Sequence, residues 1–107
     1  MKKTHHFKTL PEPFEAMWQG QKPFEIRNND RDYKLGDKFC SQEYDPIRMT
    51  FSGREIWGSI TYFVGYEKWG LPAGLCVFGC GDLVNIDNVS AQKELKDLEH
   101  SAKGEGE

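Results

Sequence analysis

Hydrophobic and polar residues alternate in several short segments of the chain, and this alternation predicts a mainly β protein. In residues 23–28 (PFEIRN), Phe24 and Ile26 fall on one side of an extended strand, whereas Glu25 and Arg27 fall on the other. Four other segments have the length and composition of strands. The strands predicted there are residues 5–10, 38–45, 54–65 and 75–80.

A helical period replaces the alternation in residues 9–20. Thr9 and Glu12 have the spacing of a capping box, and Gly20 suits the position after the last turn. The spacing i, i+4, i+7 and i+8 places four apolar residues on one helical face: Leu10, Phe14, Met17 and Trp18. We therefore expect one amphipathic helix between the first two strands.

The order strand, helix and four strands predicts an α+β fold that is mainly β. Five short strands and one helix within roughly 80 residues favour a small β-barrel, or a strongly bent sheet, capped by the helix. This predicted domain comprises residues 1–89. Residues 90–107 are expected to form a C-terminal helix, from Ser90 to about Ala102, and a flexible acidic tail.

Composition and charge narrow the classes of function. The 107 residues, 37% of them hydrophobic, support one domain with one modest core. The net charge is −3, so overall charge does not indicate binding to a long nucleic-acid duplex. No apolar run reaches the roughly 18 residues of a membrane span, and no apolar stretch of a secretion signal follows the N-terminal lysines. A cytoplasmic protein without a membrane partner is expected.

The cysteines and histidines predict no metal or redox centre. Cys40, Cys76 and Cys80 are odd in number and match no zinc or disulfide spacing, so we expect buried free thiols in a reducing compartment. His5 and His6 are adjacent, so in a strand they point to opposite faces. No P-loop or dinucleotide fingerprint occurs, and no cofactor is expected.

The charged residues around the strand at 23–28 are the first candidates for chemistry. Glu25 and Arg27 share a strand face, and Lys22 enters the strand just before Pro23. Together these three side chains can bind a phosphate or the polar edge of a base, and they can also transfer protons. The alternative is a cluster of ion pairs on a solvated surface.

The segment that follows this strand is rich in polar residues and reads as a loop. Asn29 and Asp30 suit a turn without any function. Arg31 can recognise phosphate or pair with a neighbouring carboxylate. In the glycine-rich loop at 65–74, Tyr66 and Trp69 are candidates for stacking on a base.

Several of these motifs occur in the order found in one known family. The stretch GQKPFEIR fits the pattern Gly-x-Lys-x-x-Glu-x-Arg, and NDRDYKLGD fits Asn-Asp-Arg-x-x-x-x-Gly-Asp. A Glu-Tyr pair and the triplet Ser-Gly-Arg follow further along the chain. With these motifs in this order, residues 5–80 resemble the ASCH domains of the PUA-like superfamily, and most closely a small bacterial and phage branch. The resemblance implies a β-barrel closed by a helix, with a cleft beside that helix that takes RNA or a nucleotide.

The resemblance also implies site residues. The binding residues that match the family motifs are His5, Lys8, Lys22, Glu25, Arg27, Asn29, Asp30 and Arg31. Some ASCH proteins are amidohydrolases that act on N4-acetylcytidine, which makes a small hydrolase the alternative function. In those enzymes a threonine nucleophile stands three residues after the lysine, where this chain has Glu25. If the chain is a hydrolase, the expected catalytic residues are Lys22, Glu25 and Glu67.

Overall fold

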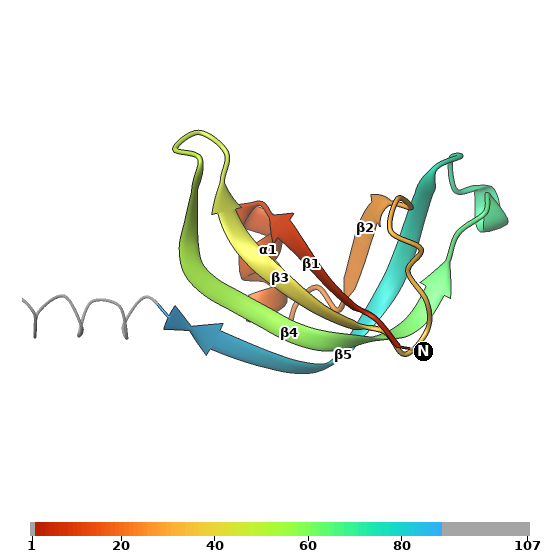
Figure 1. Cartoon of the computed structure of the whole chain (residues 1–107). Coiled ribbons are helices and arrows are strands. Elements are labelled where there is room, and N and C mark those ends of the chain that lie inside the picture. The colour runs from red at the N-terminus through yellow and green to blue at the C-terminus, as the bar shows by residue number, and fades with distance from the viewer. Residues whose placement is uncertain (1, 89–107) are drawn as a thin grey trace, which may run out of the picture.

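A five-stranded sheet curls into a half-barrel, and one α-helix packs against it (Figure 1). The structure is a computed structural model that describes residues 2–88. Its elements are β1 (Thr4–Thr9), α1 (Pro11–Trp18), β2 (Phe24–Asn28), β3 (Lys38–Asp45), β4 (Thr50–Val64), the 3-10 turn η1 (Lys68–Gly70) and β5 (Leu75–Asp87). The predicted class, α+β and mainly β with a capping helix, is confirmed. The helix and tail predicted for residues 90–107 lie outside the described residues.

The two edges of the sheet come from segments close in sequence. The strand order is β1-β3-β4-β5-β2, in which β1 pairs with β3 in parallel and every other pair is antiparallel. The long strands β4 and β5 bend strongly, so β1 and β2 approach each other across the open side of the half-barrel (Figure 1). No backbone ladder joins these two edges within the described sheet. The barrel is therefore open along one seam, and α1 covers one end.

The last strand is longer than its sequence pattern predicts. The predicted strand ended at residue 80, yet β5 continues to Asp87. A Cβ on Gly81 would lie 2.6 Å from the Cγ2 atom of Thr61 on the neighbouring strand. Asp82 has a φ of 52°, and the pairing register shifts nearby. The glycine thus allows close strand packing at an irregular point in the ladder and does not end the strand.

The predicted capping box at the start of the helix is wrong. Leu10 occupies the N-cap position without a side-chain cap, and Pro11 begins α1. Thr9 stays in β1, where its hydroxyl oxygen lies 2.5 Å from that of Ser41 on β3. The residue before a proline favours an extended backbone, so the helix cannot start until Pro11. Phe14 and Met17 are buried, as their spacing predicts.

An aromatic cluster fills the inside of the half-barrel. Phe78 on β5 is fully buried, and its ring centroid lies 5.0 Å from that of Tyr33 and 6.0 Å from that of Phe39. Phe7 on β1 completes the group at 6.2 Å from Phe78. The cluster joins three strands and the loop after β2, so it links both sides of the open seam.

A buried carboxylate attaches the loop after β2 to the first strand. Asp37 accepts hydrogen bonds from the backbone N–H groups of Lys3 and Lys34, each at 3.1 Å. Its Oδ2 atom also lies 2.8 Å from Nε2 of His5, and both side chains are buried. Burial by itself raises the pKa of Asp37, but these hydrogen bonds outweigh it and leave the pKa below its usual 3.8.

The stability of the fold is therefore expected to fall in acid partly through Asp37. Because its pKa is lower in the folded state, its contribution is complete above the ordinary pKa of 3.8 and is lost as pH falls through the folded value. Urea unfolding of the wild type and of Asp37→Asn at pH 7, 5, 4 and 3 tests this. We expect the variant to be less stable at pH 7 by about 1–3 kcal/mol and to lose less stability on acidification.

The stability of the Asp37→Asn variant should still depend on pH, because the pKa of Glu43 is also lowered in the folded state. Burial raises the pKa of Glu43, but hydrogen bonds from Arg54 outweigh it and lower the pKa overall. Parallel curves for the wild type and Asp37→Asn between pH 5 and pH 3 would contradict the role assigned to Asp37.

No helix within residues 2–88 combines the length and the apolar character needed to cross a membrane.

Candidate functional site

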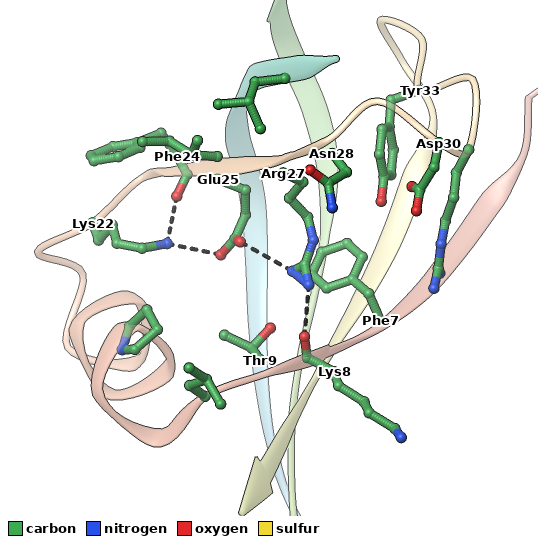
Figure 2. A pocket seen from close by; sticks show the side chains of 15 residues that line it. Phe7, Lys8, Thr9, Lys22, Phe24, Glu25, Arg27, Asn28, Asp30 and Tyr33 are labelled. Atoms are coloured by element: carbon green, nitrogen blue, oxygen red, sulfur yellow. Dashed lines mark hydrogen bonds and ion pairs between the residues drawn. The ribbon is translucent and has the colours of Figure 1, made fainter. Parts of the chain in front are cut away.

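A pocket of about 650 Å³ opens at the seam between β1 and β2 (Figure 2). Its walls are formed by β1, the start of α1, β2 and the loop after β2. Four cationic side chains line it, those of Lys8, Lys22, Arg27 and Arg31, together with two carboxylates, those of Glu25 and Asp30. The lining therefore carries a net charge of +2, although the whole chain carries −3.

The charged side of β2 is its more buried side, and the apolar side is the more exposed one. Glu25 is only 4% exposed, whereas Phe24 is 41% and Ile26 is 59% exposed. The alternation predicted from the sequence is present, but it is reversed relative to the usual amphipathic strand. Of the two interpretations left open for this strand, a solvated surface of ion pairs is wrong for Glu25. A buried carboxylate needs partners, and its neighbours supply them.

Lys22, Glu25 and Arg27 form one continuous polar array on the pocket wall (Figure 2). The Nζ atom of Lys22 donates to the carbonyl oxygen of Phe24 at 2.6 Å and to Oε1 of Glu25 at 2.8 Å. The NH1 group of Arg27 lies 3.4 Å from Oε2 of Glu25. Lys22 precedes β2 and approaches from the end next to α1. By strict alternation, Lys22 would lie on the opposite face from Glu25 and Arg27. Because Lys22 lies before the strand begins, its side chain can still reach them.

Two arginines bridge the open seam to the free edge of β1. Arg27 donates from NH2 to the carbonyl oxygen of Lys8 at 2.7 Å, and its guanidinium lies 3.9 Å from the ring centroid of Phe7. Arg31 donates to the carbonyl oxygen of His6. These two carbonyls are two residues apart, on the side of β1 that faces away from β3. Arginine side chains thus replace the backbone ladder that would close a full barrel.

The structure separates the predicted site residues into two groups. Six of them line the pocket: Lys8, Lys22, Glu25, Arg27, Asp30 and Arg31. Lys8 directs its ammonium group away from the array, 4.3 Å from the ring centroid of Tyr44 (Figure 2).

The remaining predicted residues lie outside the pocket lining. His5 is buried against Asp37 and supports the loop. The backbone N–H of Asn29 donates to the carbonyl oxygen of Gly74, which ties that loop to the one between β4 and β5. The other three lie on this second loop and are exposed: Tyr66, Glu67 and Trp69.

Tyr33 is the main pocket residue that the sequence analysis missed. Tyr33 lines the pocket and is buried, and this burial raises the pKa of its hydroxyl although the charges of Arg27 and Arg31 oppose the change. In the sequence, the only indication of Tyr33 was that it is a single aromatic residue within a strongly charged loop. Cys80 is also buried near the array, and its burial, with the charge of Glu25, raises its pKa to about 12. The Cys80 thiol therefore stays protonated and unreactive, as expected for a core cysteine.

The part of the chain that the structure describes contains no cluster of side chains suited to bind a metal ion. Within residues 2–88, no three His, Cys, Asp or Glu side chains are grouped so that they could hold an ion.

Comparison with known proteins places this half-barrel and its pocket in a defined family. Residues 4–80, which include all of the pocket residues, match the family described as "Domain of unknown function (DUF3850)". The chain belongs to this family. It is also similar to the "Uncharacterized 12.9 kDa protein in GpA 3'region" of Escherichia phage P2, with 30% identity over 69 residues. That match covers 64% of this chain and 62% of the length of the phage protein. A phage protein is therefore among the relatives of this chain, as expected, but the description of the matched family does not mention ASCH domains.

Proposed function

We propose that the pocket between β1 and β2 binds RNA or a nucleotide, and that the chain is an ASCH-like binding module. The observation that carries this proposal is the meeting of Lys22, Glu25 and Arg27 in one pocket, whose lining carries a net charge of +2 although the chain is acidic overall. The motif resemblance to ASCH domains supports the same function. Lys22 and Arg27 offer hydrogen-bond donors to phosphate or to a base, and Glu25 offers acceptors.

The shape and charge of the pocket favour a compact ligand. A volume of about 650 Å³ lies in the range typical of small-molecule sites. Long duplexes are generally bound by an extended basic stripe, whereas here four of the chain's 14 Lys and Arg residues line one pocket. Phe24 and Tyr33 add aromatic surface to the lining. A modified nucleoside, a nucleotide or one exposed nucleotide of an RNA fits these properties.

A small amidohydrolase remains the second candidate, because Lys22 and Glu25 are 2.8 Å apart in a pocket. Such a pair can transfer protons to and from a substrate. Glu67, the third residue expected for catalysis, lies outside the pocket lining, so any proton transfer would depend on Lys22 and Glu25.

Removal of one cation of the array is expected to weaken nucleotide binding. We expect Lys22→Ala to bind nucleoside monophosphates and short single-stranded RNA roughly tenfold to hundredfold more weakly, because it deletes a charged donor. Fluorescence anisotropy and filter binding at 50 to 300 mM salt measure this. Lys34→Ala removes an exposed lysine outside the pocket and is the matched control.

Three results decide between the candidates. Absence of binding to any nucleotide or RNA at 50 mM salt, or equal losses in Lys22→Ala and Lys34→Ala, would contradict the binding module. Release of acetate from N4-acetylcytidine by the wild type, and its loss in Lys22→Ala, would favour the hydrolase instead.

A further inference from the structure

Within the proposed nucleotide-binding function, on which this inference rests, we propose that the array of Lys22, Glu25 and Arg27 selects a guanine-type ring. The relevant edge of such a ring carries a carbonyl oxygen followed by two N–H donors. The ligand class is then a guanine nucleotide, free or as one unpaired nucleotide of an RNA. Three features of the array support this choice.

The first feature is the order of hydrogen-bonding groups along the array. Lys22 Nζ is a donor, the two oxygens of Glu25 are acceptors, and Arg27 NH1 is a donor again. Guanine presents the complementary order: the acceptor O6, the donors N1–H and N2–H, and the acceptor N3. Lys22 would donate to O6, while Glu25 would accept from N1–H and N2–H. Arg27 would lie on the side of N3.

The second feature is the remaining capacity of the carboxylate. An ionised Glu accepts about four hydrogen bonds. Of the contacts the structure gives for Glu25, one oxygen accepts from Lys22 at 2.8 Å and the other has a long contact of 3.4 Å with Arg27. Each oxygen therefore retains acceptor capacity in a group that lines the pocket. A ligand with two adjacent donors can use both oxygens together, as a guanidinium does in a bidentate pair.

The third feature is that the array is fixed before any ligand arrives. Lys22 is held by the Phe24 carbonyl, and Arg27 is held by the Lys8 carbonyl and the face of Phe7. Glu25 is buried between them. A fixed set of groups loses little freedom on binding and so discriminates strongly between ligands.

Other bases fit this array less well. Adenine and cytosine each place an acceptor nitrogen next to their amino group, and that nitrogen would face a carboxylate oxygen. Uracil has one N–H between two carbonyl oxygens. A site that hydrogen-bonds particular polar groups rejects ligands that lack them, because its own groups are then left unpaired.

The experiment compares GMP with IMP, which lacks only the 2-amino group, and with AMP, CMP and UMP. Isothermal titration calorimetry of the wild-type chain is expected to give GMP the highest affinity and IMP about tenfold weaker binding. Glu25→Gln has nearly the same shape but one acceptor oxygen fewer. In this variant the ratio of the affinity for GMP to the affinity for IMP should fall to about 2 or less. Glu12→Gln, on the exposed first turn of α1, should keep the wild-type ratio.

The outcomes separate this inference from the proposed function. If all five nucleotides bind within about twofold of one another, or if Glu25→Gln keeps the wild-type ratio, base selection by Glu25 is overturned while nucleotide binding stands. If no nucleotide and no RNA binds, both are overturned. A uridine pentamer with one central guanosine, compared with GMP, distinguishes an RNA from a free nucleotide. A guanine preference in either supports the proposal.

Discussion

Replacing Phe78 with alanine is expected to lower the free energy of unfolding by about 3–5 kcal/mol. Phe78 is fully buried and packs against three other aromatic rings, those of Phe7, Tyr33 and Phe39. Its loss removes buried apolar surface and leaves a cavity that the curved strands cannot readily fill. Because small domains have only about 5–15 kcal/mol of total stability, the variant should be close to unfolding.

Urea unfolding followed by tryptophan fluorescence measures this change. Tyr62→Ala is the matched control, since it removes an aromatic residue that is exposed on β4 and should cost about 1 kcal/mol or less. Equal losses in the two variants would show that the aromatic cluster does not hold the seam together.

The second large effect is expected at Glu25. Glu25→Ala should lower the free energy of unfolding by about 2–3 kcal/mol, because it leaves Lys22 and Arg27 without their shared anion. The side chains of these two cations are 18% and 21% exposed, so water compensates part of the loss. We therefore expect a smaller cost than for a fully buried ion pair.

A triple variant separates the structural role of the array from its role in binding. Replacing all three charges with apolar residues of similar size, as Lys22→Met, Glu25→Leu and Arg27→Met, should recover most of the stability lost in Glu25→Ala. The same variant should bind no nucleotide at concentrations that saturate the wild type. Urea unfolding and calorimetry on the same samples test both points. Full nucleotide binding by the triple variant would contradict the site, and failure to recover stability would show that the array is required for the fold.

Local sequence patterns predicted most of the elements of this protein. The alternation in residues 23–28 and the helical spacing of Phe14 and Met17 depend only on the two repeat periods of the backbone, so they can be read without tertiary contacts. For β1, β2, β3 and β4, both the first and the last residue lie within a few residues of the predicted bounds. Two errors lie at Thr9 and Gly81, where a partner strand decided the outcome, and a third is the start of β4, at Thr50 instead of residue 54. Thr9 bonds to Ser41, and Gly81 packs against Thr61.

The candidate site was only partly predictable for the same reason. The motif GQKPFEIR indicated Lys22, Glu25 and Arg27 together, and the structure brings them into one array. It did not indicate Tyr33, because a lone aromatic residue in a charged loop has no periodic partner. The family resemblance also suggested His5, but in the structure the His5 side chain is buried and bonds to Asp37. A short motif identifies residue types but not which of them face the same space.

The sequence alone predicted the class of fold, the helix, and which residues of β2 share each face. It could not decide which face of β2 is buried. That choice depends on the bend of β4 and β5, which brings β2 back to β1 so that Arg27 reaches the carbonyl oxygen of Lys8. Because charged partners line the inside of the seam, Glu25 is buried there, while Phe24 and Ile26 remain exposed. Periodicity is a property of neighbouring residues, whereas burial is decided by distant strands.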